Sequence, residues 1–463
     1  MKIGLIFPNK NNKDKSVHLG LGYIVSFTQK VHNDLSFELL DTRVATKKEQ
    51  KNFYKTKFDI VGITVSNMTF YEATESISSV KKNFPNTIIC VGGPHVTMVK
   101  GEIMENPNIN YAVFGEGEET FSELISLLKG ELSVTKIKGL IYRRETIICN
   151  EPRENIKNLN DLPFPAYNIF KMNRYPTHRI ITSRGCPYEC LFCLDSKIWN
   201  SQWRKREINS VIGELLYLFQ NYGKKNVVFI DNSFDIEINR VVQLCNQIIE
   251  NKINFLWSAN LRGENITPFV AKKLKSAGCY NVSTGIESAN NNVLKRINKK
   301  VTIEQMTEGI KHLKEQNIEV LGMFMIGNIG DTPETIKESI AWAKNSQLDF
   351  VKFYSVIPYK GTPLWHEINK TGRIKSDNIL EYGKIIPPVF FETPEFSYHQ
   401  RAEAIRLAEA EGYFWYCFGN HKNSLIDIAK TITLKTQTIL PEKFAGLFYL
   451  QARKMYNRIW SKN

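Results

Sequence analysis

Three cysteines within one short stretch are the strongest chemical signal in this 463-residue sequence. Cys186, Cys190 and Cys193 fall within eight residues, whereas the other cysteines are scattered, at 90, 149, 245, 279 and 417. Three thiolates in one loop can hold three irons of a cubane cluster, which leaves the fourth iron open to a substrate or cofactor. Structural zinc is the alternative, but it favours paired cysteine knuckles or histidine partners, and no second knuckle accompanies this loop.

The cysteine loop follows the first of six strands expected in the second half of the chain. Apolar runs predict these strands at 179–182, 226–230, 255–259, 282–285, 320–326 and 350–356, with amphipathic helices between them. Six consecutive strand–helix units indicate a partial or complete parallel barrel, a (β/α)6 arrangement with its chemistry at the carboxyl ends of the strands. The cysteines stand at such an end.

The first 130 residues predict a second α/β unit. Buried-type strands are expected at 3–7, 59–65, 88–93 and 111–115, and apolar residues at helical spacing occupy 70–84. Such alternation indicates a doubly wound parallel sheet, whose ligands lie beyond the carboxyl ends of the strands. Those ends are rich in glycine here, which lets the backbone approach a bulky ligand closely.

These patterns divide the chain into four expected regions. They are a Rossmann-type domain at 1–130, a hairpin and proline-stiffened linker at 131–174, a barrel at 175–370 and a helical region at 371–463. The last helix, expected at 444–459, has an apolar face flanked by basic residues. Packing on the barrel is favoured there over peripheral contact with a membrane surface.

Charge and hydropathy narrow the class of protein. Lysine and arginine number 61 against 47 aspartate and glutamate, a net charge of +14. Because the basic residues are scattered, a solvated surface is favoured over a nucleic-acid groove. No run of about 18 apolar residues predicts a spanning helix, and the apolar start is too short for a signal peptide. We expect a cytoplasmic protein, whose reducing compartment disfavours disulfides.

The cysteine loop resembles the signature of the radical S-adenosylmethionine (SAM) superfamily. Cys186, Cys190, Phe192 and Cys193 match its Cys-x3-Cys-x-aromatic-Cys pattern, and the stretch 182–185 before them is typical of it. The resemblance implies a [4Fe-4S] cluster whose open iron is chelated by the methionine moiety of SAM. It further implies reductive cleavage to a 5′-deoxyadenosyl radical, with electrons from a donor such as flavodoxin or ferredoxin.

Later strand ends resemble the cofactor contacts of this superfamily. Asp231 and Asn232 stand where the family binds the methionine amino group, although the commoner form there is Gly-Gly-Glu. The resemblance likewise implies SAM contacts after the later strands, with Arg262 placed to pair with the methionine carboxylate. The other implied contacts are Phe192, Ser258, Glu287, Ser288, Gly327 and Ile357.

The amino-terminal region resembles the cobalamin-binding domain of class B radical SAM enzymes. The resemblance implies corrinoid contacts at Gly20, Gly22, Ser66, Gly92, Gly93, Pro94, His95, Gly115, Glu116 and Gly117. The Asp-x-His-x-x-Gly pattern of cobalamin domains is absent, since Asp14 and His18 have the wrong spacing. Two alternatives follow: cobalamin binds base-off without a histidine ligand, or the domain keeps the fold without the corrin.

This pairing of domains favours a radical methylase that acts on an unactivated carbon of a small-molecule or natural-product substrate. A cobalamin-associated radical oxidoreductase, cyclase or rearrangement enzyme shares every motif. A non-enzymatic corrinoid- or nucleic-acid-binding protein is the alternative from another class, and the intact cysteine triplet disfavours it. The substrate is not identified, although aromatic residues after 413 indicate an apolar or flat molecule, or a core.

Overall fold

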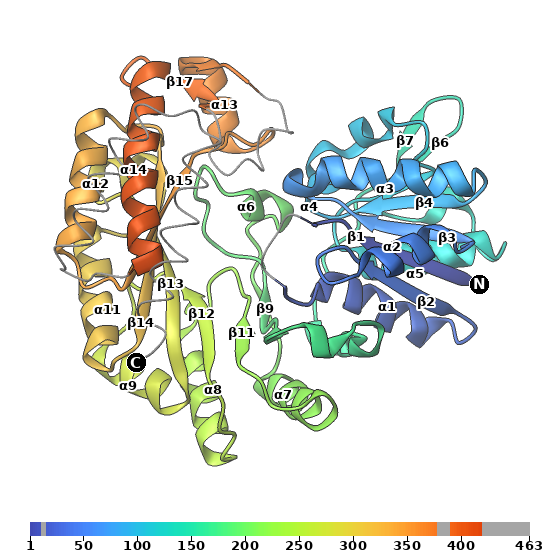
Figure 1. Ribbon diagram of the computed structural model, residues 1–463, viewed down its shortest axis with the longest axis horizontal. Coiled ribbons are helices and arrows are strands. Elements are labelled where there is room, and N and C mark those ends of the chain that lie inside the picture. Colours follow the sequence, from blue (N-terminus) through green and yellow to red (C-terminus); the bar gives the residue numbers. More distant parts are fainter. Residues whose placement is uncertain (11–14, 377–388, 419–463) are drawn as a thin grey trace.

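The computed structural model describes residues 1–10, 15–376 and 389–418, with 409–418 described by backbone alone. Two sheet-based halves lie side by side, and helix α6 (Leu194–Ile198) lies between them, next to α4 (Pro94–Val99) (Figure 1). The amino-terminal half ends with a hairpin, and the second half is the expected barrel.

The amino-terminal half contains a seven-stranded sheet of order β2-β1-β3-β4-β5-β6-β7. The first five strands are parallel and the last two antiparallel. The predicted hairpin within 131–174 is present as β6–β7, and it extends this sheet. The strands are β1 Lys2–Phe7, β2 Ser36–Asp41, β3 Ile60–Thr64, β4 Ile88–Gly92, β5 Tyr111–Val113, β6 Leu140–Arg143 and β7 Ile147–Cys149.

Helices cover both faces of this sheet because its central strands are apolar on both sides. Every residue of β3 is buried. One apolar layer joins the strands to α1 and α5, and the other joins them to α2, α3 and α4. The doubly wound arrangement is therefore confirmed. The helices are α1 Leu19–Val31, α2 Lys47–Tyr54, α3 Phe70–Asn83 and α5 Gly117–Leu128, with the 3-10 helix η2 Lys100–Glu105 after α4.

The second half is a six-stranded parallel sheet of order β15-β14-β13-β12-β11-β8, which confirms the expected partial barrel. Buried residues alternate with half-buried or exposed ones along β12 and β14, so one face packs on the helices and the other faces the barrel interior. The strands are β8 His178–Ile180, β11 Val227–Phe229, β12 Trp257–Leu261, β13 Cys279–Glu287, β14 Glu319–Ile326 and β15 Phe350–Ser355.

The barrel's outer layer consists of helices in the connections between strands. They are α7 Ile208–Tyr222, α8 Ile238–Glu250, α9 Pro268–Ser276, α10 Asn291–Arg296, α11 Ile303–Glu315 and α12 Pro333–Asn345. Their apolar faces and the strands form the largest core cluster. Cys245 and Cys279 are buried in it and Cys90 in the first half, as core packing requires.

In the carboxyl-terminal region, the described residues form helices and one short strand pair. Helix α13 (Pro363–Thr371) and the pair β16 (Arg373–Ile374) and β17 (Phe391–Glu392) precede α14 (Tyr398–Phe418), which packs along β15. The predicted helix at 444–459 and Asp14 lie outside the described residues. Within the described part of the chain, no helix is long and apolar enough to cross a membrane.

Candidate functional site

The cysteine loop connects β9 (Ser183–Arg184) to α6 at the face of the barrel that meets the amino-terminal half (Figure 1). Strand β9 pairs antiparallel with β10 (Arg204–Lys205), which closes the loop at its base. Gly185 has φ +83°, and a Cβ there would lie 1.9 Å from the carbonyl oxygen of Gln202. The position before the first cysteine therefore requires glycine.

The three cysteines lie together in this loop, with Cys190 buried and the other two half-buried. Burial raises the pKa of the Cys186 thiol and raises that of Cys193 to about 12, and the nearby Cys190 adds to both shifts. No three His, Cys, Asp or Glu side chains of the described residues surround a single point as ligands of one ion do. Each cysteine of a cubane cluster binds its own iron.

Arg262, predicted to meet the SAM carboxylate, anchors the cysteine loop to the barrel. Its guanidinium stacks 3.6 Å from the ring centroid of Tyr188, which lies between the first two cysteines. Its Nε donates to Glu264 (2.7 Å) and one Nη donates to the Lys299 carbonyl. Only 8% of the side chain is exposed, so these contacts fix its position.

The two residues predicted to hold the methionine amino group after β11 point to different places. Asp231 is buried, and its carboxylate accepts from the amide (3.1 Å) and hydroxyl (2.8 Å) of Thr182 and from the Ser183 hydroxyl. Asp231 thus holds the segment that leads into the cysteine loop. Asn232 instead donates to the carboxylate of Asp195, just after the last cysteine.

The end of β13 carries a strained residue and a cation that the motifs did not reveal. Glu287 has φ +66°, which is unfavourable for a side chain of this size and is characteristic of functional sites. Its carboxylate lies 3.0 Å from the ammonium of Lys299, and both side chains are buried. Ser288 points elsewhere, because its hydroxyl accepts from the amide of Asn290.

The remaining predicted SAM contacts are Gly327, Ile357, Phe192 and Ser258. Gly327 has φ +91°, its amide donates to Asp331 (3.0 Å) and its carbonyl accepts from Arg401. Ile357 and Phe192 are half-buried against one small apolar cluster, so the cysteine loop packs against the segment that follows β15. Ser258 is half-buried on the interior face of β12, between two buried neighbours.

A cavity of about 390 Å³ separates the glycine-rich strand ends from the barrel, and we call it the interdomain cavity. Seven of the ten predicted corrinoid contacts line it: Gly20, Gly92, Gly93, Pro94, Gly115, Glu116 and Gly117. The barrel half contributes Ile181, Arg184, Trp199 and Asn232. The motifs marked none of these four as a corrinoid contact, although Asn232 was predicted to contact SAM. Both halves therefore build one site.

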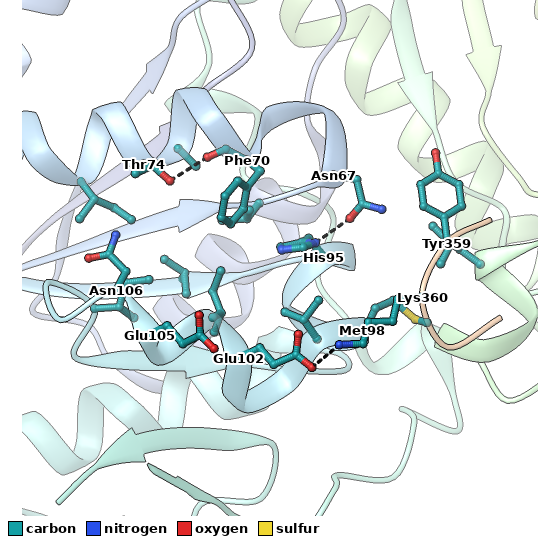
Figure 2. A pocket seen from close by; sticks show the side chains of 18 of the residues that line it. Asn67, Phe70, Thr74, His95, Met98, Glu102, Glu105, Asn106, Tyr359 and Lys360 are labelled. Carbon is teal, nitrogen blue, oxygen red and sulfur yellow. Dashed lines mark hydrogen bonds and ion pairs between the residues drawn. The ribbon is translucent and has the colours of Figure 1, made fainter. Parts of the chain in front are cut away.

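The three remaining predicted contacts lie outside the interdomain cavity. Gly22 packs on the linker, since a Cβ there would lie 2.8 Å from Pro165. Ser66 exchanges hydrogen bonds with Thr69 at the start of a short helix. His95 faces a second cavity, beside Asn67 (Figure 2).

His18 lines the interdomain cavity, and its hydrogen bond decides what it can offer a metal. Its Nδ1 accepts from the Leu21 amide (3.2 Å) and caps α1. Burial lowers the pKa of His18 to about 4, and Arg43 adds to the shift, so the ring is neutral. The proton of a neutral ring then sits on Nε2, which becomes a donor and has no lone pair for cobalt. The residues present fit a corrinoid without a histidine ligand.

Buried ion pairs join the halves beside this cavity. Arg184, directly before Gly185, binds Glu116 (2.6 Å) and Glu118 (2.7 Å), and Arg204 also binds Glu116 (2.7 Å). The Arg184 guanidinium also lies 4.9 Å from the ring centroid of Tyr23. At most one tenth of each of these charged side chains is exposed. Charges so deeply buried need these partners, so the halves are fixed to each other.

Comparison with known proteins agrees with this geometry. Residues 180–343 match the Radical SAM superfamily and residues 15–125 match the B12 binding domain. An uncharacterised methyltransferase of Pyrococcus horikoshii is 32% identical over 89% of this chain and 92% of its own length. This chain belongs to the radical SAM superfamily, in the group with a B12-binding domain. The anaerobic magnesium-protoporphyrin IX monomethyl ester cyclase of Rubrivivax gelatinosus is 26% identical, but the chain spans only 63% of it.

Solved structures share the fold of this radical SAM enzyme. The radical SAM methyltransferase TsrM of Kitasatospora setae, with cobalamin and a [4Fe-4S] cluster bound, superposes with a TM-score of 0.69. The identity is 19%, and the match covers 81% of each chain. OxsB, a cobalamin-dependent SAM radical enzyme, gives a TM-score of 0.72 at 18% identity and covers 97% of this chain and 72% of its own. The doubly wound sheet followed by a radical SAM barrel is thus confirmed.

Proposed function

We propose that this chain is a cobalamin-dependent radical SAM methyltransferase that methylates an unactivated carbon of a small molecule. One observation carries the proposal: the interdomain cavity is lined both by glycine-rich strand ends of the B12-binding half and by Trp199 and Asn232 of the barrel half. Trp199 directly follows α6, the helix after the cysteine loop, and Asn232 donates to Asp195 on that helix. A ligand of this cavity therefore contacts the segment that follows the cluster cysteines.

Residues of the chain would hold three cofactors. Cys186, Cys190 and Cys193 would hold a [4Fe-4S] cluster, SAM would occupy the barrel mouth, and cobalamin the interdomain cavity. When bound, these groups supply a 5′-deoxyadenosyl radical and a methyl group. The protein's part is to fix the loop through Arg262 and to bury the site from water. A flavodoxin or ferredoxin of the reducing cytoplasm would deliver the electrons.

A cyclase or other radical oxidoreductase is the second candidate, because cyclases are among the relatives of this chain. The two candidates differ in the mass of the product. A gain of one methyl group, with S-adenosylhomocysteine and 5′-deoxyadenosine formed together, supports the methyltransferase. A change in hydrogen or oxygen content alone supports the cyclase.

Anaerobic reconstitution with iron and sulfide, with and without hydroxocobalamin, tests the proposal without a known substrate. With SAM and a reductant, we expect 5′-deoxyadenosine and, when cobalamin is present, methylcobalamin and S-adenosylhomocysteine. Replacing Cys186, Cys190 or Cys193 by alanine should abolish the cluster absorption and the nucleoside product. Cys245→Ala is the matched control, because Cys245 is buried in the barrel core and should leave both readouts unchanged.

Gly92→Leu separates the two cofactors. Gly92 lines the interdomain cavity and has ordinary strand geometry, and a Cβ there would meet its first neighbours only at 3.5 Å. The leucine should fill the cavity, lowering methylcobalamin formation at least tenfold while 5′-deoxyadenosine formation persists. Methylcobalamin formation at the wild-type rate in this variant would contradict the placement of cobalamin. Methylated product at full rate in cobalamin-free enzyme would contradict the methyltransferase itself.

A further inference from the structure

A second cavity, of about 560 Å³, lies on the other side of the sheet from the interdomain cavity. We call it the α3–η2 cavity, because α3 and the segment from α4 through η2 form its walls (Figure 2). At the barrel side it is closed by Leu194, Tyr359, Lys360 and Trp365. Leu194 directly follows Cys193, so this end adjoins the cluster loop.

The volume and the walls suit a small organic molecule. Ligand pockets generally range from about 300 to 1,000 Å³, with mostly apolar walls and a few polar groups that fix orientation. Here Phe70, Ala73 and Ile77 of α3 face Val99 and Ile103 across the cavity. An apolar occupant would remove these walls from water, which is favourable in proportion to the area covered.

His95 supplies an acceptor within these walls. Its Nδ1 lies 2.7 Å from Oδ1 of Asn67, an acceptor, so Nδ1 carries the proton. Burial lowers the pKa of His95 to about 4, and the neutral ring therefore has a lone pair on Nε2. No described residue donates to this Nε2, and the ring packs edge-on against Phe70 at 5.0 Å. A ligand that fills this space meets the nitrogen as an acceptor.

Apart from one ion pair, the charge that lines the α3–η2 cavity is negative. Three charged side chains line the cavity, and two of them, Glu102 and Lys360, pair with each other at 2.8 Å. Glu105 remains, with no ion-pair partner in the described part of the chain. Asn106 nearby uses its side-chain oxygen to accept from the Asn108 amide. A carboxylate at one end of an apolar cavity favours a cation over an anion.

We propose that the α3–η2 cavity binds an apolar small molecule that carries a primary amine. The apolar body lies between α3 and η2, a donor group meets His95, and the ammonium group meets Glu105. Leu194 closes the inner end, so a molecule in this cavity contacts the residue that directly follows Cys193. Binding in the cavity does not rest on the proposed function.

Binding of matched probes tests the cavity directly. Decylammonium, decanoate and decanol share one chain and differ in their charge, and calorimetry on the reconstituted holoenzyme gives the Kd of each. We expect decylammonium to bind at least tenfold more tightly than decanoate, with decanol between them. Glu105→Gln should remove most of the preference for the ammonium. Equal binding of the three probes, or no binding of any, would overturn the proposal.

Variants that fill the α3–η2 cavity provide a second test. Thr74→Trp places an indole in the cavity, while Ser78→Trp, one turn later on α3, is the matched control on the exposed side. Both residues donate their hydroxyl to the carbonyl four residues earlier, so the two variants lose equivalent bonds. Thr74→Trp should weaken decylammonium binding at least tenfold, and Ser78→Trp should not. Unchanged binding in Thr74→Trp refutes the site.

A further variant and a further measurement distinguish failure of the cavity assignment from failure of the proposed function. Met98→Trp fills the cavity from α4, so the test stands if Thr74→Trp does not fold. Cleavage of SAM without an added ligand should persist in both filled variants, because Thr74 and Met98 lie on helices of the amino-terminal half and the three cysteines do not. Wild-type enzyme that binds decylammonium but cleaves no SAM would refute the proposed function and leave the cavity assignment standing. SAM cleavage without binding of decylammonium would refute the cavity assignment and leave the proposed function standing.

Discussion

Replacing Arg184 by methionine tests whether buried ion pairs hold the two halves together. Arg184 is the partner that the structure shows for Glu118 at 2.7 Å, and both side chains are more than nine-tenths buried. Removing one member of a buried pair leaves an uncompensated charge and costs about 3–5 kcal/mol. Glu116 keeps Arg204 and the Ile156 amide as partners, so the lower end of that range applies.

We therefore expect Arg184→Met to lower the free energy of unfolding in urea by about 3 kcal/mol. The double variant Arg184→Met/Glu118→Gln should recover about 1–2 kcal/mol, because the amide leaves no buried charge behind. Lys157→Met is the control, since its pair with Glu154 is exposed (87% and 78%) and should contribute nothing measurable.

The recovery in the double variant decides the question. If Arg184→Met acted only by losing packing against Tyr23, Glu118→Gln would add its own loss and the double variant would be less stable still. Wild-type stability in Arg184→Met would refute the reasoning more directly, because it would mean that Glu118 finds water or another cation. The assay also reports cluster absorption, which should fall with stability because Arg184 adjoins Gly185 and the cysteine loop.

Two further substitutions test the loops at the barrel mouth. Gly185→Ala should prevent cluster reconstitution, because its Cβ overlaps the Gln202 carbonyl oxygen; Gly130→Ala, at φ +81° with open space around it, should cost only about 1–2 kcal/mol in urea. Asp331→Asn should remove a pH dependence of the free energy of unfolding. Burial raises the pKa of Asp331 to about 6, so the folded state binds the extra proton and the free energy of unfolding of the wild type falls by about 2 kcal/mol as pH rises from 4 to 6. Urea unfolding at both pH values checks this, and an equal fall in the variant would contradict it.

The sequence predicted the features that depend on neighbours along the chain. The cysteine spacing and the apolar runs of the barrel are local patterns, and both were found where expected. Strand β2 was missed because it forms the edge of its sheet, and only Leu40 and Asp41 of its residues are buried. An edge strand needs no continuous apolar run, so its pattern does not differ from that of a polar loop.

The sequence motifs did not predict contacts between residues that are far apart along the chain. Arg184 and Glu118 are 66 positions apart, and Lys299 approaches Glu287 through a loop that no pattern marks. The Gly-Gly-Pro-His stretch shows a subtler limit. Gly92, Gly93 and Pro94 line the interdomain cavity while His95 faces the α3–η2 cavity, because the chain turns from strand into helix between them. Neighbouring residues of one motif thus line two different cavities.

The placement of Glu116 explains why the two halves act as one unit. This residue begins the turn into α5, lines the interdomain cavity and receives both Arg184 and Arg204 from the barrel half. Arg184 in turn sets the start of the cysteine loop. Separating the halves would strip these buried charges of their partners, at a cost too large for an easy hinge motion. The wall of the interdomain cavity and the base of the cysteine loop are therefore parts of one rigid connection.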